Sequence, residues 1–246
     1  MEPEALILAV DAGNTRIKWG LHDGRGWAAT GAVATSEAAR LAEAWEGLPR
    51  VGRALACNVA GPGVERSIAA ACARKGASLE TLAPRREQLG VVNGYRDPAQ
   101  LGSDRWAALV AAHAARRAHQ LVVNAGTALT VDALAADGRF LGGLIVPGPA
   151  LMRRSLDSGT AALRLTEGAF ADFPASTPDA ITTGAVQACV GAIERMAASM
   201  AARALPAERV VLSGGAAGEI ARHLPMPFAI HENLVLDGLA LIARAS

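Results

Sequence analysis

The chain has 246 residues and almost balanced charge, with 24 Lys and Arg residues against 23 Asp and Glu residues. Balanced charge provides no field that would draw the chain to nucleic acid or to an anionic membrane, so neither partner is expected. The three cysteines are odd in number and lack the spacing of metal ligands, which argues against a disulfide framework or a zinc site. No apolar run is long enough to span a bilayer and no basic leader opens the chain, so a soluble cytoplasmic protein is expected.

Two strands joined by a tight turn are predicted near the start of the chain. The first strand ends at Asp11, and the turn that follows contains Gly13, Asn14 and Thr15. Gly13 lets a ligand approach the backbone, the next two side chains offer hydrogen bonds, and Lys18 adds a positive charge. This combination suits a nucleotide phosphate with its metal ion. An ordinary turn capped by Asp11 is the alternative.

The rest of the chain alternates between predicted strands and helices, the pattern of an α/β protein. Strands are expected at 53–61, 78–82, 121–134 (two strands with a turn), 140–147, 209–213 and 227–231. Helices are expected at 36–45, 63–75, 103–117, 151–158, 178–203 and 234–245. Residues 84–102 and 160–177 are read as irregular, with Thr177 as the N-cap of the following helix and Pro178 at its first position.

The first irregular segment contains Tyr95, the only tyrosine, and leads into the sequence Gly102-Ser103-Asp104-Arg105. Ser103 or Asp104 can cap the next helix, which puts Asp104 and Arg105 in a first turn where backbone N–H groups are unpaired and the helix dipole is positive. Asp104 as a functional carboxylate and Asp104 as a simple cap are both open. The long segment ahead of the helix favours function.

A weak internal repeat links the opening stretch to a later one. The sequence Asn124-Ala125-Gly126-Thr127 aligns with residues 11–15 when one residue is dropped. Two such turns facing each other would line a cleft able to hold a triphosphate from two sides. A later Gly214-Gly215-x-x-Gly218 turn could let a nucleoside lie against backbone, although it matches neither a Walker loop nor a dinucleotide fingerprint.

In order and spacing, these motifs resemble those of type III pantothenate kinases. The resemblance rests on residues 11–18, Tyr95 with residues 102–106, residues 124–127 and residues 142–148, and it extends from Leu6 to about Gly184. It implies an α/β fold of the acetate and sugar kinase, Hsc70 and actin superfamily. Two ribonuclease-H-like (actin-like ATPase) domains, expected at 1–118 and 119–246, would then surround a nucleotide cleft, in agreement with the internal repeat.

The resemblance implies ATP-dependent phosphorylation of the pantothenate 4′-hydroxyl, the first step of coenzyme A biosynthesis, by a homodimer. The phosphates of ATP would be bound by Thr127 and by the first turn, with Mg²⁺ held near Asp11 through water; the residues of that turn are Asp11, Ala12, Gly13, Asn14, Thr15, Arg16, Ile17 and Lys18. Pantothenate would be bound by Tyr95, Gly102, Ser103, Asp104 and Arg105. Asp104 would be the general base, and Thr177 would reach pantothenate in the neighbouring subunit.

One position departs from the family pattern, because Asn124 stands where an Asp that binds a monovalent cation is usual. An amide oxygen can still coordinate K⁺ or NH₄⁺, but the full charge that would favour such a requirement is absent. The alternative function is a nucleotide-binding regulatory (transcription accessory) protein with weak or no kinase activity. Neutral charge and the lack of a helix-turn-helix signal count against direct DNA binding. A sugar or carboxylate kinase of the same superfamily is a third reading, disfavoured by the stretch from Tyr95 to Trp106.

Overall fold

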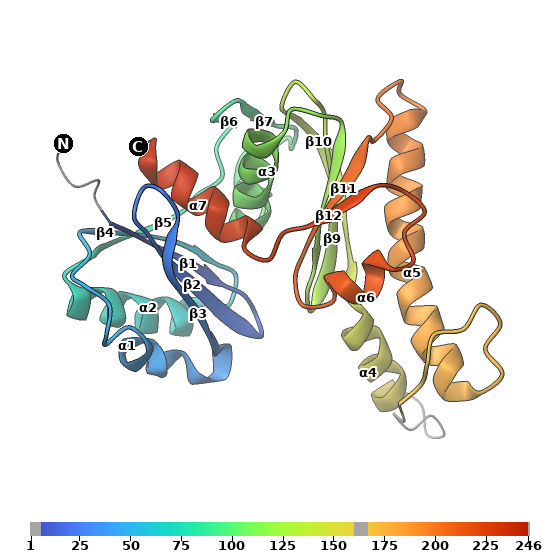
Figure 1. Ribbon diagram of the computed structural model, residues 1–246, viewed down its shortest axis with the longest axis horizontal. Helices are drawn as coiled ribbons and strands as arrows, with labels where there is room; N and C mark the ends of the chain where they lie inside the picture. The colour runs from blue at the N-terminus through green and yellow to red at the C-terminus, as the bar shows by residue number, and fades with distance from the viewer. Residues whose placement is uncertain (1–5, 160–166, 246) are drawn as a thin grey trace. The chain divides into compact units, whose positions relative to one another are not determined.

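The structure, a computed structural model, describes residues 6–159 and 167–245. The chain forms two compact units: unit 1 consists of residues 1–115 with 233–246, and unit 2 of residues 116–232. Each unit is a mixed α/β structure with helices packed on a sheet (Figure 1).

Unit 1 contains a five-stranded sheet in the order β3-β2-β1-β4-β5. Its elements are β1 (Ile7–Ala12), β2 (Arg16–His22), β3 (Trp27–Ala34), the 3₁₀ segment η1 (Thr35–Arg40), α1 (Leu41–Ala44), β4 (Arg53–Asn58), α2 (Pro62–Lys75), β5 (Ser78–Thr81), β6 (Glu87–Gln88), β7 (Val91–Asn93), η2 (Pro98–Gln100), α3 (Ser103–Ala115) and α7 (Leu234–Arg244). Strand β1 is antiparallel to β2 and parallel to β4.

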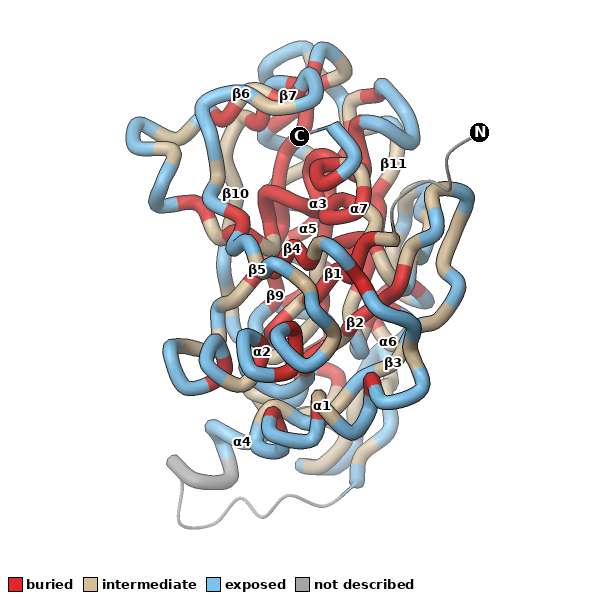
Figure 2. The backbone as a smooth tube through the Cα atoms, turned by 90° about the vertical axis from the view of Figure 1, so that its left-hand side faces the viewer, coloured by how far each residue is buried: buried red, intermediate tan, exposed pale blue. Residues whose placement is uncertain are grey.

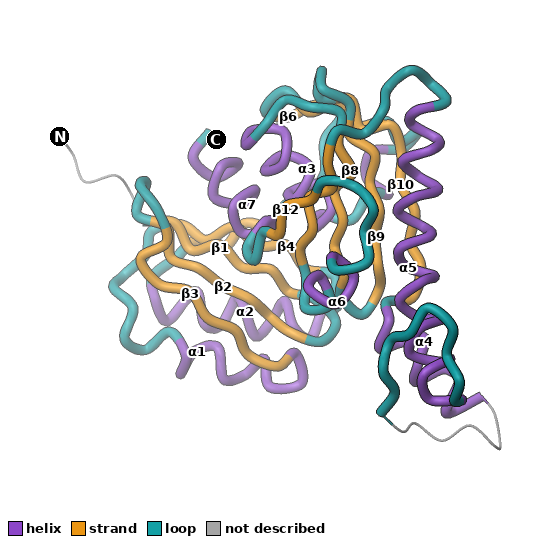
Figure 3. Tube along the Cα trace, turned by 45° about the vertical axis from the view of Figure 1, so that its right-hand side comes forward, coloured by secondary structure: helices purple, strands orange, loops and turns teal. Residues whose placement is uncertain are grey.

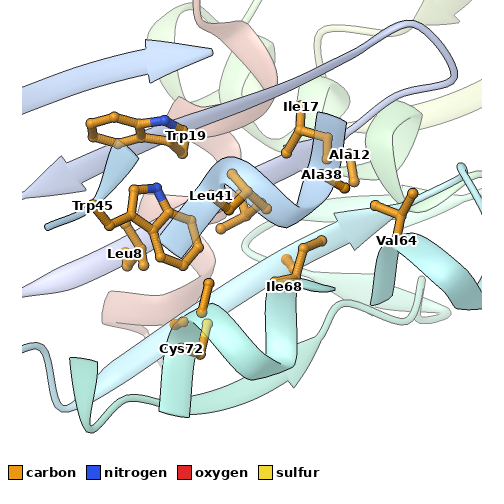
Figure 4. Packing of buried hydrophobic residues seen from close by; sticks show 14 of the residues in the cluster. Leu8, Ala12, Ile17, Trp19, Ala38, Leu41, Trp45, Val64, Ile68 and Cys72 are labelled. Atoms are coloured by element: carbon orange, nitrogen blue, oxygen red, sulfur yellow. The ribbon is translucent and has the colours of Figure 1, made fainter. Parts of the chain in front are cut away.

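The apolar core of unit 1 lies against one face of this sheet. Alternate residues of the strands, such as Leu8 in β1 and Ile17 in β2, belong to one buried cluster with Ile68 of α2 (Figure 4). The indole rings of Trp19 and Trp45 meet edge to face, with their centroids 6.4 Å apart. Each large side chain that is fully buried here contributes about 1.5–3 kcal/mol to folding. Because side chains alternate along a strand, the residues between them, Asp11 among them, point to the opposite face.

The opposite face of the sheet is covered by α3 and α7, which lie together in the buried interior of unit 1 (Figure 2). Gly238 of α7 allows this close packing, because a Cβ atom there would lie 2.0 Å from the carbonyl oxygen of Ala107 in α3. The indole N–H of Trp27 donates to Asp237 of α7 at 2.8 Å. The expected division at residue 118 placed residues 119–246 in one domain, whereas the last helix packs with unit 1.

The second sheet has seven strands, of which the five in unit 2 lie in the order β12-β11-β8-β9-β10. The elements of unit 2 are β8 (Gln120–Ala125), β9 (Ala128–Leu134), β10 (Arg139–Pro147), α4 (Pro149–Gly159), α5 (Thr177–Ala201), β11 (Arg209–Ser213), α6 (Ala217–Ala221) and β12 (Phe228–Ile230). The long helix α5 runs along one face of the sheet (Figure 3), where its Val186, Val190 and Ile193 share a core with Leu121 and Val123 of β8.

The two sheets repeat the same plan. In each, the first strand is antiparallel to the second (β1 with β2, β8 with β9) and parallel to a fourth strand (β4 or β11) that continues to the edge strand. The internal repeat predicted from residues 11–15 and 124–127 is therefore present in the fold.

Some local expectations were wrong. Strand β3 was not predicted, the helix expected at 36–45 consists of η1 and the single turn α1, and the segment 84–102 contains β6, β7 and η2. The N-cap of α5 is Ser176, whose hydroxyl accepts from the backbone N–H of Asp179 at 3.3 Å, rather than Thr177, which is the first helical residue. Of the second irregular segment, residues 160–166 lie outside the described residues.

The three cysteines, Cys57, Cys72 and Cys189, are free and buried. Among the residues that the structure describes, no helix combines the length and the apolar character that a membrane crossing needs.

Candidate active site

A row of three side chains crosses the sheet of unit 1 near the end of β1. In the strand register, Asp11 of β1 lies opposite Lys18 of β2 on one side and opposite Cys57 of β4 on the other. The neighbours of these residues along each strand point into the apolar core. The three side chains therefore leave the sheet on the other face, toward α3 and α7.

Two hydrogen bonds from Thr35 fix the turn after β1. Its hydroxyl donates to the carbonyl oxygen of Gly13 at 2.7 Å, and its backbone N–H donates to the carbonyl of Thr15 at 3.0 Å. The backbone N–H of Gly13 closes the turn by donating to the carbonyl of Arg16 at 3.1 Å. The residues at positions 14–16 are exposed. The turn is thus a fixed backbone loop with its polar side chains facing solvent, as a phosphate-binding turn requires.

The first turn of α3 brings a second carboxylate to the same place. The side chain of Ser103 is hydrogen-bonded to the thiol of Cys57, which ties the start of α3 to β4. Asp104 accepts a hydrogen bond from the backbone N–H of Arg105 at 2.8 Å. A Cβ atom on Gly102 would lie 2.5 Å from an Asp104 carboxylate oxygen, so glycine leaves the room that this carboxylate occupies.

The electrostatics show that the two carboxylates interact. Burial and the nearby Asp104 carboxylate raise the pKa of Asp11 from 3.8 to about 7, and the Lys18 ammonium opposes this rise. Burial, followed by the charges of Asp11 and Asp104, also raises the pKa of the Cys57 thiol well above its usual 9.0. Cys57 therefore stays protonated and is not a nucleophile.

A carboxylate whose pKa approaches neutrality favours a nearby cation, because a cation relieves the repulsion between Asp11 and Asp104. Within residues 6–159 and 167–245, no three His, Cys, Asp or Glu side chains gather in a way that could hold a metal ion by themselves. One or two carboxylates completed by water and substrate phosphates are the usual surroundings of Mg²⁺ in phosphoryl-transfer sites. The donor set fits a Mg²⁺ ion that is bound together with a nucleotide.

Tyr95 and Arg105 form a second polar pair at the start of α3. Arg105 is only 5% exposed, its guanidinium donates to the Tyr95 hydroxyl at 3.0 Å, and its central carbon lies 5.7 Å from the centroid of the Tyr95 ring. The indole of Trp106 donates to the side chain of Gln88 in β6 at 2.8 Å. The motif around Tyr95 and the motif at residues 102–105 are therefore brought together within unit 1.

In unit 2, Asn124 holds the same position on β8 that Asp11 holds on β1. Its register partners are Thr130 of β9 and Ser213 of β11. Ser213 is 4% exposed, and among the described residues its hydroxyl oxygen has no hydrogen-bond partner. Gly214 follows at φ +93°, and a Cβ atom there would lie 2.7 Å from the amide oxygen of Asn124. The side chains of Asn124, Thr130 and Ser213 offer uncharged oxygen atoms as ligands. Such ligands suit a monovalent cation or water better than a divalent metal.

Thr127 lies in the turn between β8 and β9. The backbone N–H of Gly126 donates to the carbonyl of Ala128 at 3.0 Å, and the N–H of Gly148 donates to the carbonyl of Thr127 at 2.8 Å. A Cβ atom on Gly148 would lie 2.1 Å from the carbonyl oxygen of Gly126, so this approach requires glycine. The predicted second phosphate turn is therefore a compact backbone turn. Thr177 lies elsewhere in unit 2, exposed at the first position of α5.

Sequence reasoning missed four residues that shape these sites: Thr35, Cys57 as a neighbour of Asp11, Arg86 and Asn93. Arg86 and Asn93 hold the loop that carries Tyr95 through hydrogen bonds to its backbone. No local motif marks them, because each acts on backbone groups brought close by folding. The buried Asn93, 1% exposed within a polar segment, is the one that its position before Gly94 could have suggested.

Three comparisons with known proteins agree with this geometry. The family model described as type III pantothenate kinase matches residues 7–199. Relatives named type III pantothenate kinase include one from Aromatoleum aromaticum, 48% identical over 97% of this chain and 98% of its own length, and one from Nitrosospira multiformis, 48% identical over 97% and 91%.

Among solved structures, the fold is similar to that of two proteins at 18% identity and a TM-score of 0.63, each covering 97% of this chain and 98% of the other. One is described as a Baf family transcriptional activator from Campylobacter jejuni, and the other as a 2-dehydro-3-deoxygalactonokinase protein from Sinorhizobium meliloti. At this identity the likeness shows the fold, which is that of the actin-like ATPases and sugar kinases.

Proposed function

Because this chain belongs to the type III pantothenate kinase family, we propose that it transfers the γ-phosphoryl group of ATP to the 4′-hydroxyl of pantothenate. The products are 4′-phosphopantothenate and ADP, and the reaction is the first step of coenzyme A biosynthesis. The observation that carries the proposal is the pair of carboxylates Asp11 and Asp104, in which burial, and after it the neighbouring Asp104 charge, raises the pKa of Asp11 to about 7. A regulatory function without turnover is not favoured, since the relatives that match nearly the full chain are named as kinases.

Phosphoryl transfer asks a protein mainly for positioning and for neutralisation of phosphate charge. We assign the ATP phosphates to the turn between β1 and β2, residues 11–18, with a further contact from Thr127. The fixed backbone of the turn, its exposed polar side chains and the Lys18 ammonium beside Asp11 support this assignment. Mg²⁺, when bound with ATP, supplies positive charge at the phosphate oxygens; the residue proposed to hold it, through water, is Asp11.

Asp104 is the proposed general base. Its carboxylate orients the 4′-hydroxyl of pantothenate and accepts the hydroxyl proton as the new bond between that oxygen and the γ-phosphorus forms. The bond from the γ-phosphorus to the bridging oxygen of ADP breaks in the same displacement, and ADP leaves with that electron pair. The position of Asp104 in the first turn of α3 supports this role, because its carboxylate is held there by the backbone N–H of Arg105 at 2.8 Å.

Pantothenate is assigned to Tyr95 and residues 102–105. The buried Arg105 guanidinium, bonded to the Tyr95 hydroxyl, supplies a positive charge that suits the pantothenate carboxylate. Thr177, exposed at the start of α5, is proposed to contact pantothenate in the neighbouring subunit of a homodimer. Small soluble substrates fit a cytoplasmic enzyme, and nucleic acid and membrane are not proposed as partners.

A monovalent cation, K⁺ or NH₄⁺, is proposed to bind only weakly near Asn124. Its amide oxygen can coordinate such a cation, and the buried hydroxyl of Ser213 lies opposite in the register. Since neither group carries charge, we expect turnover without added K⁺, with modest activation by it.

The deciding experiment measures ADP release by the purified protein with ATP and Mg²⁺, with and without pantothenate and with and without K⁺. Release that depends on pantothenate and saturates with it establishes the kinase. Absence of release in all conditions, by protein with a cooperative thermal unfolding transition, would contradict the proposal and favour the regulatory reading.

A further inference from the structure

Side chains outside the motifs assigned above hold the loop that carries Tyr95 in place. Residues 86–93 form a hairpin in which Glu87 pairs with Val92 and Gln88 with Val91. Its two turn residues, Leu89 and Gly90, both have positive φ, 51° and 82°, as a type I′ turn requires. The strands then diverge, and the chain continues from Asn93 into the Tyr95 loop.

The hairpin is anchored to α3. The side chain of Gln88 accepts a hydrogen bond from the Trp106 indole at 2.8 Å, and Val91 is completely buried. Trp106 follows Asp104 and Arg105 in the same helical turn. The hairpin is therefore fixed relative to the helix that carries the proposed base.

Arg86, the residue before β6, holds the Tyr95 loop from this anchored hairpin. One of its terminal nitrogens donates to the carbonyl oxygens of Asn93 at 3.3 Å and Tyr95 at 2.9 Å, and the other donates to the carbonyl of Arg96 at 3.1 Å. Three carbonyls of one turn thus converge on one planar guanidinium. Lysine lacks the rigid fork needed to reach all three.

The side chain of Asn93 also fixes the loop, through hydrogen bonds to the loop backbone. This side chain is buried, accepts the backbone N–H of Tyr95 at 3.0 Å and donates to the carbonyl of Pro98 at 3.3 Å. The backbone N–H of Asn93 donates to the carbonyl of Arg86 at 2.9 Å. The backbone on both sides of Tyr95 is bound to Arg86 or Asn93, while the Tyr95 hydroxyl is bound to Arg105.

We propose that Arg86 is a positioning residue for acceptor binding, which sets the backbone of the Tyr95 loop so that Tyr95 and Arg105 meet pantothenate in one arrangement. The inference rests on the proposed function. It adds that acceptor affinity depends on a side chain that acts only on carbonyl groups of the loop. When these bonds are lost, the substrate must order the loop as it binds. The free-energy cost of that ordering weakens substrate binding and leaves the chemical step unchanged.

The test compares Arg86→Gln and Arg86→Lys with the matched control Arg85→Gln, which removes the same charge one residue away. For both Arg86 variants we expect KM for pantothenate to rise about fivefold to tenfold, with kcat and KM for ATP within about twofold of the parent. Arg85→Gln should leave all three constants unchanged. Equal constants for Arg86→Gln and Arg85→Gln, or a fall in kcat with KM unchanged, would overturn the proposal.

Amide hydrogen exchange of peptides covering residues 93–98 separates this inference from the proposed function. Arg86→Gln should exchange faster there than Arg85→Gln, with no change in α2. If the parent protein shows no turnover of pantothenate, the proposed function fails; unchanged exchange in residues 93–98 would then also remove Arg86 from its positioning role.

Discussion

The ends of β1 and β8 hold the same place in the two sheets but carry different chemistry. The residues in register across them are Lys18, Asp11 and Cys57 in unit 1, and Thr130, Asn124 and Ser213 in unit 2. The pattern of burial along the two strands is identical, so the backbone frame is not the source of the difference. The same backbone frame therefore presents ionisable groups in unit 1 and uncharged oxygen atoms in unit 2.

Because of this difference, the two sites are expected to respond differently to pH and to cations. In unit 1, the pKa of Asp11 lies near 7, so protons and divalent cations compete for one carboxylate pair. Asn124 does not titrate, and its row offers dipoles rather than charge. Substitutions that exchange or remove these groups test the comparison directly.

The largest effect is expected from Asp104→Asn, which removes the second charge of the unit 1 site. Loss of the proposed base should lower kcat by about 10³-fold, measured by pantothenate-dependent ADP release. Glu65→Gln is the matched control, because Glu65 lies in the first turn of α2 in the same unit, and it should keep full activity. Equal activity of the two variants would exclude Asp104 from catalysis.

Asp11→Asn should make the protein more stable at pH 8 in the absence of Mg²⁺, by about 1–2 kcal/mol. The folded-state pKa of Asp11 is raised above its ordinary value of 3.8, so ionisation costs folding energy that grows as pH rises from about 4 to about 7. The difference between variant and parent should become small near pH 4, where the Asp11 side chain of the folded protein is protonated and uncharged, as asparagine is. Urea unfolding at pH 4, 6 and 8 measures it.

Asp23→Asn provides a control of opposite sign for that experiment. Backbone N–H groups of Arg25 and Gly26 bind the Asp23 carboxylate at 2.8 and 2.9 Å and lower its pKa. Its contribution to stability is present above the ordinary pKa and is lost as pH falls. A stability difference for Asp11→Asn that is independent of pH would show that the pKa of Asp11 is not raised in the folded protein.

Asn124→Asp makes the unit 2 row resemble that of unit 1. The added carboxylate should strengthen activation by K⁺, with a concentration for half-activation about fivefold lower than in the parent. Potassium titrations of ADP release, with choline chloride keeping ionic strength constant, measure this. Identical potassium curves for variant and parent would show that no monovalent cation binds beside position 124.

The smallest effect is expected from Ser213→Ala, within about 0.5 kcal/mol of the parent, because the described part of the chain offers the buried hydroxyl no hydrogen-bond partner to lose. Ser176→Ala, which removes the N-cap of α5, should cost about 1 kcal/mol in the same urea experiment. A large cost for Ser213→Ala would reveal a bound water or cation that the hydroxyl supports.

Much of the fold follows from local patterns in the chain. The hairpin at Asp11, the later hairpin at Asn124 and the long helix after Pro178 were predictable from apolar runs, turn residues and a proline near a helix start. Strand β3 was not, because its small residues alternate between half-buried and exposed positions without a strong apolar signal. The turn of the β6–β7 hairpin could not be recognised in the sequence, because it contains Leu89 and leucine seldom adopts positive φ.

The candidate site was predictable only in its separate parts. Asp11 and Asp104 each occur in a recognisable local setting, the end of a strand and the start of a helix. Their proximity depends on α3 packing beside β4 and α7 on the sheet face that the core leaves free, and no local pattern contains that information. The same holds for Arg86, whose three acceptors are backbone carbonyls and therefore leave no trace in the side-chain sequence.

The packing of Gly238 against Ala107 has a consequence for the order of folding during synthesis. Unit 2 lies, in chain order, between the first 115 residues of unit 1 and its last helix. The ribosome therefore releases all of unit 2 before α7 emerges, and until then the sheet face that carries Asp11 lacks one of its two covering helices. The unit that begins first is thus completed last, and the sheet face that carries Asp11 is fully covered only after residues 234–244 have emerged.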